Sequence, residues 1–232
     1  MNIINMGGYH ELHLLNCDYD VDLIYEFINK YDKYGIVCDD VYVLKMITEL
    51  THPDTIVSVI LRNTDNIRNN DDIIFSKLLS NHNNSLSIIN FSGSNIPEDL
   101  FQHIIKYISI CTNLKYFSIS DVDTLSSESI ENLLNNLLIS DSIEYLNISN
   151  TDFHNWNGLL NLLENSKSLR YLEISNIEFD LYIIDVLIES LNKCESLTTF
   201  ESVDSVIVDG EDFKDFMYND SIDTRIEQII NF

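Results

Sequence analysis

The chain has 232 residues, 45% of them hydrophobic, and carries 13 Lys and Arg against 38 Asp and Glu, a formal net charge of −25. The apolar content is sufficient for a continuous core and excludes a chain that is disordered throughout. The acidic excess repels nucleic-acid phosphates and anionic membrane surfaces and attracts basic partners, although such acidity also serves solubility alone. No segment approaches the roughly 18 apolar residues that span a bilayer, and no signal-peptide pattern is present. We therefore expect a cytoplasmic or nuclear protein that is not secreted.

The first 54 residues are expected to form an N-terminal cap. A strand pattern at Tyr9, Leu12 and Leu14 is followed by the next such pattern only at Ile56. The long interval between them contains two segments of helical periodicity, which predict helices at roughly 21–34 and 39–50. Residues 1–54 are thus expected to hold one strand and two helices.

Residues 55–205 repeat one strand–helix unit. Apolar residues fit the template L-x-x-L-x-L at starts spaced by 26 to 30 residues, and Ser202 is the one polar residue at these inward positions. The starts are Ile56, Leu86, Leu114, Ile143, Leu169 and Leu197. The helix-period segments between them are 71–82, 97–110, 127–139, 158–166 and 181–193. Such a period predicts stacked coils with parallel strands and outer helices. Residues 206–232 are expected to form a C-terminal cap from two short amphipathic pieces, 211–220 and 221–232.

The segments "EYLNISNTDF" (144–153) and "RYLEISNIEF" (170–179) resemble leucine-rich repeats of the ribonuclease-inhibitor type. The resemblance implies an α/β solenoid with a curved parallel sheet on its concave side and helices on its convex side. The family usually has Asn at the ninth template position, where this chain has Val122 and Ile177 in two coils. The eighth position is instead always Asn, Asp or Gly, so we expect each strand to turn one residue earlier than in the family.

Alternate strand residues are expected to line the concave face, because neighbours in a strand point to opposite sides. Tyr116, Tyr145 and Tyr171 then form an aromatic row near two glutamates. The candidate partner-binding residues are Ile88, Tyr116, Tyr145, Asn147, Tyr171, Glu173 and Glu201. Neighbouring rings on a sheet also stabilise each other without a ligand, by about 0.2–1 kcal/mol per pair. Both interpretations stay open on the sequence alone.

The cysteine and histidine residues do not form a motif typical of a metal-binding or catalytic site. Cys111 and Cys194 occupy equivalent positions three coils apart, too far for a disulfide, and we expect free thiols. The possible metal ligands are His10, His13, Cys17 and Cys38. The repeat register does not bring these four side chains to one point, so a metal site is not expected. The sequence has no phosphate-binding glycine loop and no hydrolase or zinc-protease motif. We therefore expect no metal, no cofactor and no enzymatic activity.

The sequence thus predicts a non-enzymatic protein-interaction module that binds a protein partner of basic or mixed charge through its concave face. Direct nucleic-acid or membrane binding is not expected, and the chain is expected to be a monomer or a subunit of a hetero-complex. The alternatives are a regulator of a GTPase or another enzyme, and an acidic structural subunit of a larger assembly. Arg62 is the only Lys or Arg among the strand residues expected on the concave face. A catalytic arginine that would act on a GTPase therefore has little support.

Overall fold

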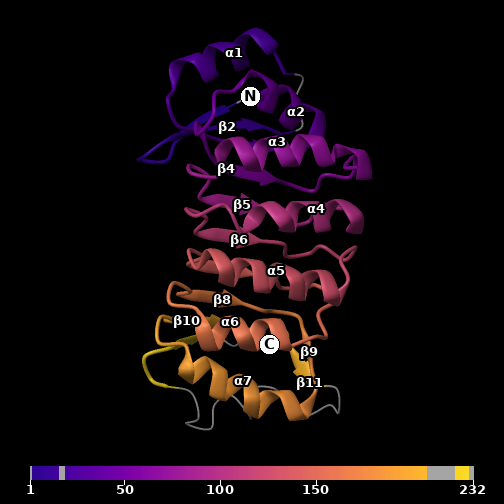
Figure 1. The fold of residues 1–232 in the computed structure, drawn as a ribbon, viewed down its shortest axis with the longest axis vertical. Helices are drawn as coiled ribbons and strands as arrows, with labels where there is room; N and C mark the ends of the chain where they lie inside the picture. The colour runs from indigo at the N-terminus through magenta and orange to yellow at the C-terminus, as the bar shows by residue number, and fades with distance from the viewer. Residues whose placement is uncertain (1, 16–18, 208–222, 230–232) are drawn as a thin grey trace.

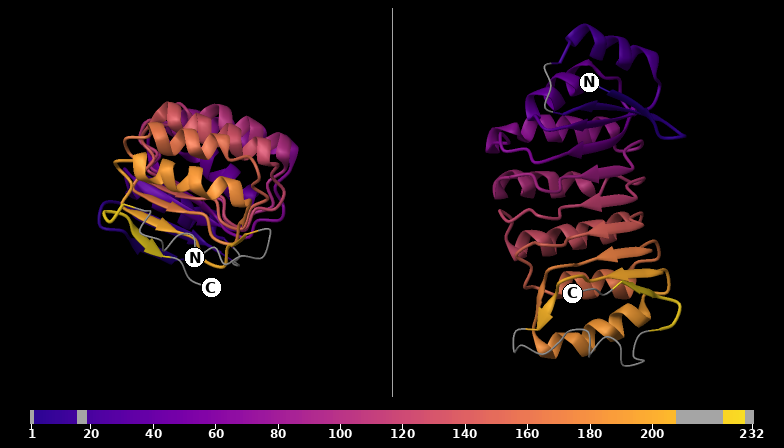
Figure 2. Two further views of the ribbon diagram at one scale, coloured as in Figure 1. Left: turned by 90° about the horizontal axis from the view of Figure 1, so that it is seen from below. Right: turned by 180° about the vertical axis from the view of Figure 1, so that it is seen from behind.

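The computed structural model describes residues 2–15, 19–207 and 223–229. The chain forms an elongated stack of strand–helix units, with helices along one side and strands along the other (Figures 1 and 2). The inward positions of the template are buried in every coil from Ile56 to Ser202. These side chains and the inner faces of the helices form one continuous core.

The strands of the described residues form a ten-stranded sheet in the order β1-β2-β3-β4-β5-β6-β7-β8-β10-β12. Only the β1–β2 pair is antiparallel. The bounds are β1 Asn2–Asn5, β2 His10–Leu14, β3 Tyr34–Cys38, β4 Ile56–Leu61, β5 Ile88–Asn90, β6 Tyr116–Ser118, β7 Tyr145–Asn147, β8 Tyr171–Glu173, β10 Thr199–Glu201 and β12 Glu227–Ile229. A separate parallel pair joins β9 Glu178–Phe179 to β11 Val206–Ile207.

The helices cover one face of this sheet (Figure 2). Their bounds are α1 Val21–Lys30, α2 Val41–Leu50, α3 Asp72–His82, α4 Glu98–Ile108, α5 Ser127–Ser140, α6 Asn157–Asn165 and α7 Leu181–Lys193, with a short 3₁₀ turn η1 Asn69–Asp71 before α3. All five helices predicted between the repeated strands are confirmed. Local caps fix several starts: the Asp20 carboxylate accepts from the amides of Asp22 and Leu23, and the Ser126 hydroxyl from that of Ser129.

The N-terminal segment differs from its prediction. The helix expected at 21–34 ends at Lys30, and two strands that were not predicted are present, β1 and β3, of which β3 runs from Tyr34 to Cys38. All five residues of β3 are buried, so the strand lacks the alternation that identifies a half-exposed strand. Gly35 fits here because a Cβ would lie 2.9 Å from the side chains of Glu11, Ser58 and Tyr9. The sheet therefore continues from β2 through β3 into β4, and a division of the chain at residue 54 stays a prediction.

In the coils from β4 to β10, the strand exits turn at the eighth template position, as expected. The left-handed residues there are Asn63, Gly93, Asp121, Asn150, Asn176 and Asp204. Asn, Asp and Gly tolerate this conformation better than other residues. The Asn176 amide donates to Asn150 Oδ1 at 2.6 Å, and the Asn150 amide donates to Asp121. This side-chain ladder lies at the exposed eighth position, whereas Val122 and Ile177 at the ninth position are buried.

The three cysteines that the structure describes are buried, as is part of the C-terminal segment. Cys38, Cys111 and Cys194 are free and buried, and burial raises the pKa of both Cys38 and Cys111 to about 12. Cys17 and the amphipathic piece 211–220 lie outside the described residues. The piece 221–232 contributes β12, which pairs with β10 and buries Ile226. Within the described ranges, no helix combines the length and apolar composition that a bilayer crossing requires.

Candidate functional site

The side of the ten-stranded sheet that none of the described helices covers is termed the open face, and it corresponds to the predicted concave face (Figure 2). Its residue rows follow the predicted register. Ile88 pairs with Tyr116, Tyr116 with Tyr145, Tyr145 with Tyr171, and Tyr171 with Thr199. The sheet therefore aligns the candidate residues from four consecutive coils in one row.

Three tyrosines form a stacked row on the open face. The ring centroids of Tyr116 and Tyr145 are 4.3 Å apart at an interplanar angle of 9°, and those of Tyr145 and Tyr171 are 4.5 Å apart at 17°. These distances match the spacing of parallel strands, so the stack follows directly from in-register tyrosines. Because the rings cover each other's faces, their edges and hydroxyl groups are what they offer to a partner.

The tyrosine hydroxyls bond glutamates of the following coil. Tyr145 Oη donates to Glu173 Oε2 at 2.7 Å, and Tyr171 Oη donates to Glu201 Oε2. Burial, together with these bonds to carboxylates, raises the pKa of both tyrosines. Both hydroxyls therefore stay protonated at neutral pH and hold the two glutamates in place.

The glutamates make the C-terminal half of the open face acidic. Glu173, Glu201 and Glu227 lie on β8, β10 and β12. In the part of the chain that the structure describes, no Lys, Arg or His nitrogen lies within 4.0 Å of any of these three carboxylates. A cation from a second molecule therefore meets preformed acceptors here without displacing an internal ion pair.

Asn147 does not have the exposure that was expected for a binding residue. It is only 8% exposed, and its Oδ1 accepts from the Ser149 amide at 2.8 Å. Asn90 makes the same bond to the Ser92 amide, so asparagine at this position caps the strand end. The expectation of an exposed Asn147 was wrong, because its side chain is buried and bonded to the backbone at the strand end. Ile88 is half-buried at the N-terminal end of the row.

The N-terminal end of the open face contains a polar cluster that sequence reasoning missed. Glu11 is 4% exposed and accepts from Tyr9 Oη at 3.2 Å and from Ser58 Oγ at 3.4 Å, while His13 Nε2 lies 3.0 Å from its Oε2. The missed strand β3 explains the omission, because Gly35 leaves room for the Glu11 side chain.

His10 and His13, two of the possible metal ligands, make other contacts. His13 faces Glu11, whereas His10 stacks on Tyr31 with ring centroids 4.1 Å apart. Among the described residues, no group of three or more His, Cys, Asp and Glu side chains has an arrangement that could hold a metal ion. Cys17 lies outside those residues.

No model of a known protein family matches the chain, and neither does any curated protein sequence. Among solved structures, the chain is similar to internalin C2 from Listeria monocytogenes str. 4b F2365, at 12% identity and a TM-score of 0.49, over 82% of this chain and 68% of that one. It is also similar to the chain in a TLR13–ssRNA13 complex, at 10% identity and a TM-score of 0.53 over 95% of this chain. This chain spans 32% of that TLR13 chain. At these identities the likeness concerns the fold alone.

The repeated coils and the structural likeness together define the class. The chain has the α/β solenoid fold of leucine-rich repeat proteins.

Proposed function

We propose that the protein is a non-enzymatic interaction module whose open face binds a Lys- or Arg-bearing segment of a partner protein. The observation that carries this proposal is the stacked tyrosine row bordered by Glu173, Glu201 and Glu227, three carboxylates without a cation within 4.0 Å among the described residues. A Lys or Arg side chain suits this arrangement, because its charged group can bond a carboxylate while its aliphatic stem packs along the ring edges.

Preorganisation supports the same proposal. The tyrosines are fixed by stacking and by their hydroxyl bonds to Glu173 and Glu201, so a partner does not have to order them. Rigid aromatic anchors supply much of the binding energy in protein interfaces, and carboxylates around them steer a basic partner. Tyrosines that only stabilise the sheet would make the same hydrogen bonds. Partner binding and stability are therefore measured separately for each variant.

The double variant Tyr145→Ala/Tyr171→Ala is expected to weaken partner binding at least about tenfold, or about 1.4 kcal/mol. The partner is recovered by affinity purification with the full chain as bait, then purified and titrated by calorimetry. Loss of the stack lowers stability by about 0.2–1 kcal/mol per ring pair, so the variant should retain its circular dichroism spectrum. The matched control is Tyr25→Ala/Tyr182→Ala, which removes two tyrosines that are 55% and 72% exposed on the helices.

A second variant, Glu173→Gln/Glu201→Gln, keeps side-chain size and removes two charges. We expect weaker binding with a smaller salt dependence, because the cation then loses its charged acceptors.

Unchanged affinity in the folded variant Tyr145→Ala/Tyr171→Ala would mean that the tyrosine row only stabilises the sheet and that the partner binds elsewhere.

A further inference from the structure

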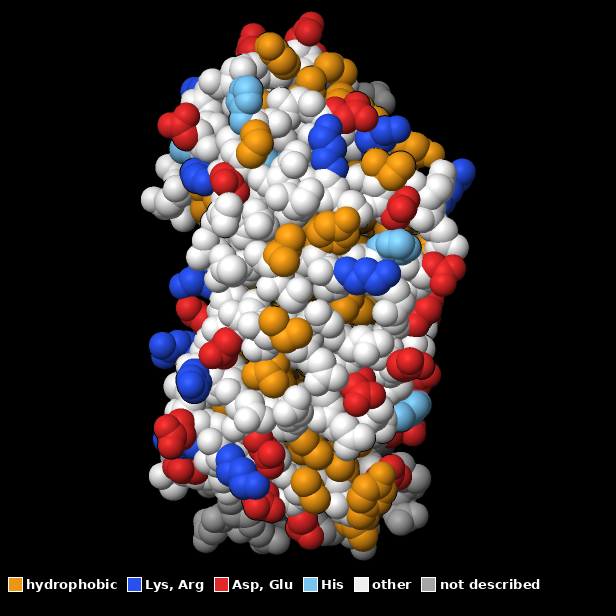
Figure 3. Space-filling model, in the orientation of Figure 1, with side chains coloured by type: hydrophobic (Ala, Val, Ile, Leu, Met, Phe, Trp, Pro, Cys, Tyr) orange, Lys and Arg blue, Asp and Glu red, His pale blue; other side chains and the backbone are white. Residues whose placement is uncertain are grey.

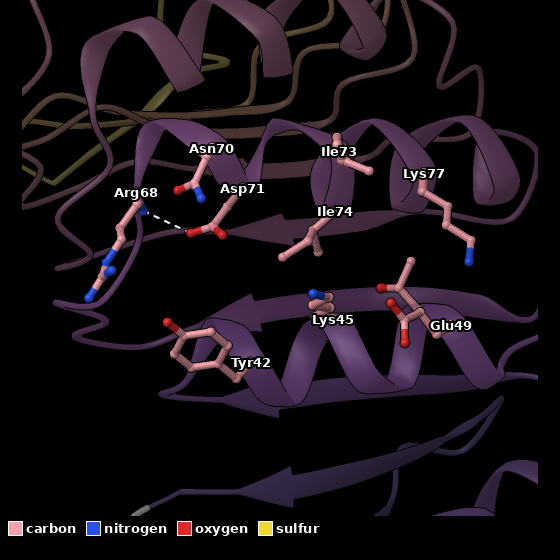
Figure 4. Close-up of a pocket in the computed structure, with 10 residues that line it drawn as sticks. Tyr42, Lys45, Glu49, Arg68, Asn70, Asp71, Ile73, Ile74 and Lys77 are labelled. Atoms are coloured by element: carbon pink, nitrogen blue, oxygen red, sulfur yellow. Dashed lines mark hydrogen bonds between the residues drawn. The ribbon is translucent and has the colours of Figure 1, made fainter.

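A groove lies on the helix side, between α2 and α3, away from the open face. It encloses about 220 Å³ and takes its walls from both helices and from the turn before α3. Figure 4 shows Tyr42 and Arg68 at one end, Lys77 and Glu49 at the other, and Ile73 and Ile74 between them. These residues come from two coils, and only the fold brings the two groups together.

Basic charge is concentrated in this groove. Lys45, Arg68 and Lys77 line it, three of the 13 Lys and Arg in a chain with 38 Asp and Glu. All three are exposed, and no carboxylate oxygen of the described residues lies within 4.0 Å of their charged nitrogens. Asp71 is buried and accepts from the Arg68 backbone amide at 2.8 Å, so Glu49 is the exposed carboxylate among the lining residues.

Helices α5, α6 and α7 each carry a net negative charge, although Lys193 on α7 pairs with Glu164 and Glu189. Exposed acids on α5, α6 and α7 are Glu128, Glu164, Asp185 and Glu189. In Figure 3, blue and orange side chains lie side by side over α2 and α3, whereas red ones are frequent in the lower half of the molecule. The groove is therefore a local basic site on a strongly acidic protein.

Apolar groups accompany the cations. The Tyr42 side chain is 51% exposed and that of Ile73 is 73% exposed, and Ile74 is buried in the wall of the groove. An exposed isoleucine and an exposed tyrosine beside a groove are suitable contacts for apolar side chains of a ligand.

The distribution of these groups indicates the shape of the ligand. Figure 4 shows that Arg68 and Lys77 lie at opposite ends of the groove and do not converge on one point, as they would around a single phosphate. Helix α2 has 10 residues, which correspond to a length of about 15 Å. An elongated ligand with several negative charges and some apolar side chains matches this arrangement.

We propose that the α2–α3 groove binds an acidic, partly apolar peptide segment of a second protein. Carboxylates of the segment pair with Lys45, Arg68 and Lys77, and its apolar side chains contact Tyr42 and Ile73. The groove lies on the opposite side of the solenoid from the tyrosine row, so it provides a second interaction surface for a partner of opposite charge.

The test selects ligands from a displayed library of random peptides of about 12 residues, a length that spans the groove as a helix or an extended segment. The full chain serves as bait, and each enriched peptide is synthesised and titrated by fluorescence anisotropy. We expect acidic peptides with Leu, Ile or Phe among those enriched. Their affinity should fall at least about tenfold in Lys45→Gln/Arg68→Gln/Lys77→Gln.

The matched control is Lys106→Gln/Lys115→Gln/Lys167→Gln, which also changes the net charge from −25 to −28 (−25 − 3) but leaves the groove intact. This control and Tyr145→Ala/Tyr171→Ala should bind the acidic peptides within about twofold of the unmodified chain. Circular dichroism and thermal melting confirm that each variant is folded.

Several results would overturn the proposal. These are the absence of enriched acidic peptides, equal affinity in the groove and control variants, and loss of peptide binding in the tyrosine variant. Preferential binding of a single-stranded RNA oligonucleotide at the groove would assign it to nucleic acid instead. A dimer in light scattering that the groove variant abolishes would assign it to a second copy of this chain.

Discussion

Replacing Phe117 by Ala is expected to lower the free energy of unfolding by about 3–5 kcal/mol, because the substitution leaves a cavity in a fully buried site. Phe117 lies on β6, in the middle of the sheet. Its ring packs edge-on against Phe91 at 6.3 Å, and Phe91 packs edge-on against Phe75 at 5.8 Å. Each coil of a solenoid contacts only its neighbours, so a cavity here weakens the coupling between the two halves.

Chemical denaturation with two control variants tests this expectation. Phe117→Leu keeps most of the buried volume and should cost less than half as much as Phe117→Ala. Ile139→Ala truncates a side chain that is 71% exposed on α5 and should change stability by less than about 0.5 kcal/mol. A loss below about 1 kcal/mol in Phe117→Ala would contradict the packed core described above.

Acidification is expected to destabilise the protein through His82. This side chain is fully buried at the end of α3, where its Nδ1 accepts from the Ile56 amide at 3.4 Å and its Nε2 lies 3.4 Å from Thr51 Oγ1. Burial lowers the pKa of His82 from 6.5 to about 4, despite the nearby Asp54 carboxylate, which acts to raise it.

The direction of the effect follows from proton binding. Between pH 6.5 and about 4 the unfolded chain binds a proton at His82 that the folded chain does not, so stability falls as the pH falls through this range. The lowered pKa corresponds to roughly 3 kcal/mol in total, and the loss between pH 7 and pH 5 should be roughly 2 kcal/mol.

Two measurements check the role of His82. The chemical shift of its ring proton should titrate near pH 4 and not near pH 6.5. His82→Gln should reduce the loss of stability between pH 7 and pH 5, whereas His103→Gln, at an exposed position on α4, should leave that loss unchanged. A normal His82 titration, or equal pH dependence in both variants, would contradict this explanation.

Much of the fold could be predicted from sequence because the signal was repeated. The inward residues of each coil, such as Ile143, Leu146 and Ile148, recur with the same spacing, and one correct register places all later strands. The positive φ angle of Asn150 was also predictable, because the eighth position holds Asn, Asp or Gly in every coil. Strand β3 was missed because its residues are buried on both faces and give no alternation.

The candidate site was only partly predictable. Register alone placed Tyr145 beside Tyr171, but the bond from Tyr145 to Glu173 depends on how a side chain reaches diagonally to the next strand. The burial of Asn147 does not follow from register either, because Asn90 at the same template position is half-buried. The α2–α3 groove could not be predicted, because it depends on how residues such as Lys45 and Lys77 from separate coils are placed in space.

Site-specific photo-crosslinking is the most direct test of the proposed binding face. A photoreactive residue is introduced in place of Ile88 or Thr199, at the two ends of the open-face row, or in place of Ile139 or Tyr182 on the helices. These helix positions lie outside the α2–α3 groove. With the purified basic partner, we expect crosslinks from Ile88 and Thr199 and none from Ile139 and Tyr182. Crosslinks from the helix positions alone would contradict binding through the open face.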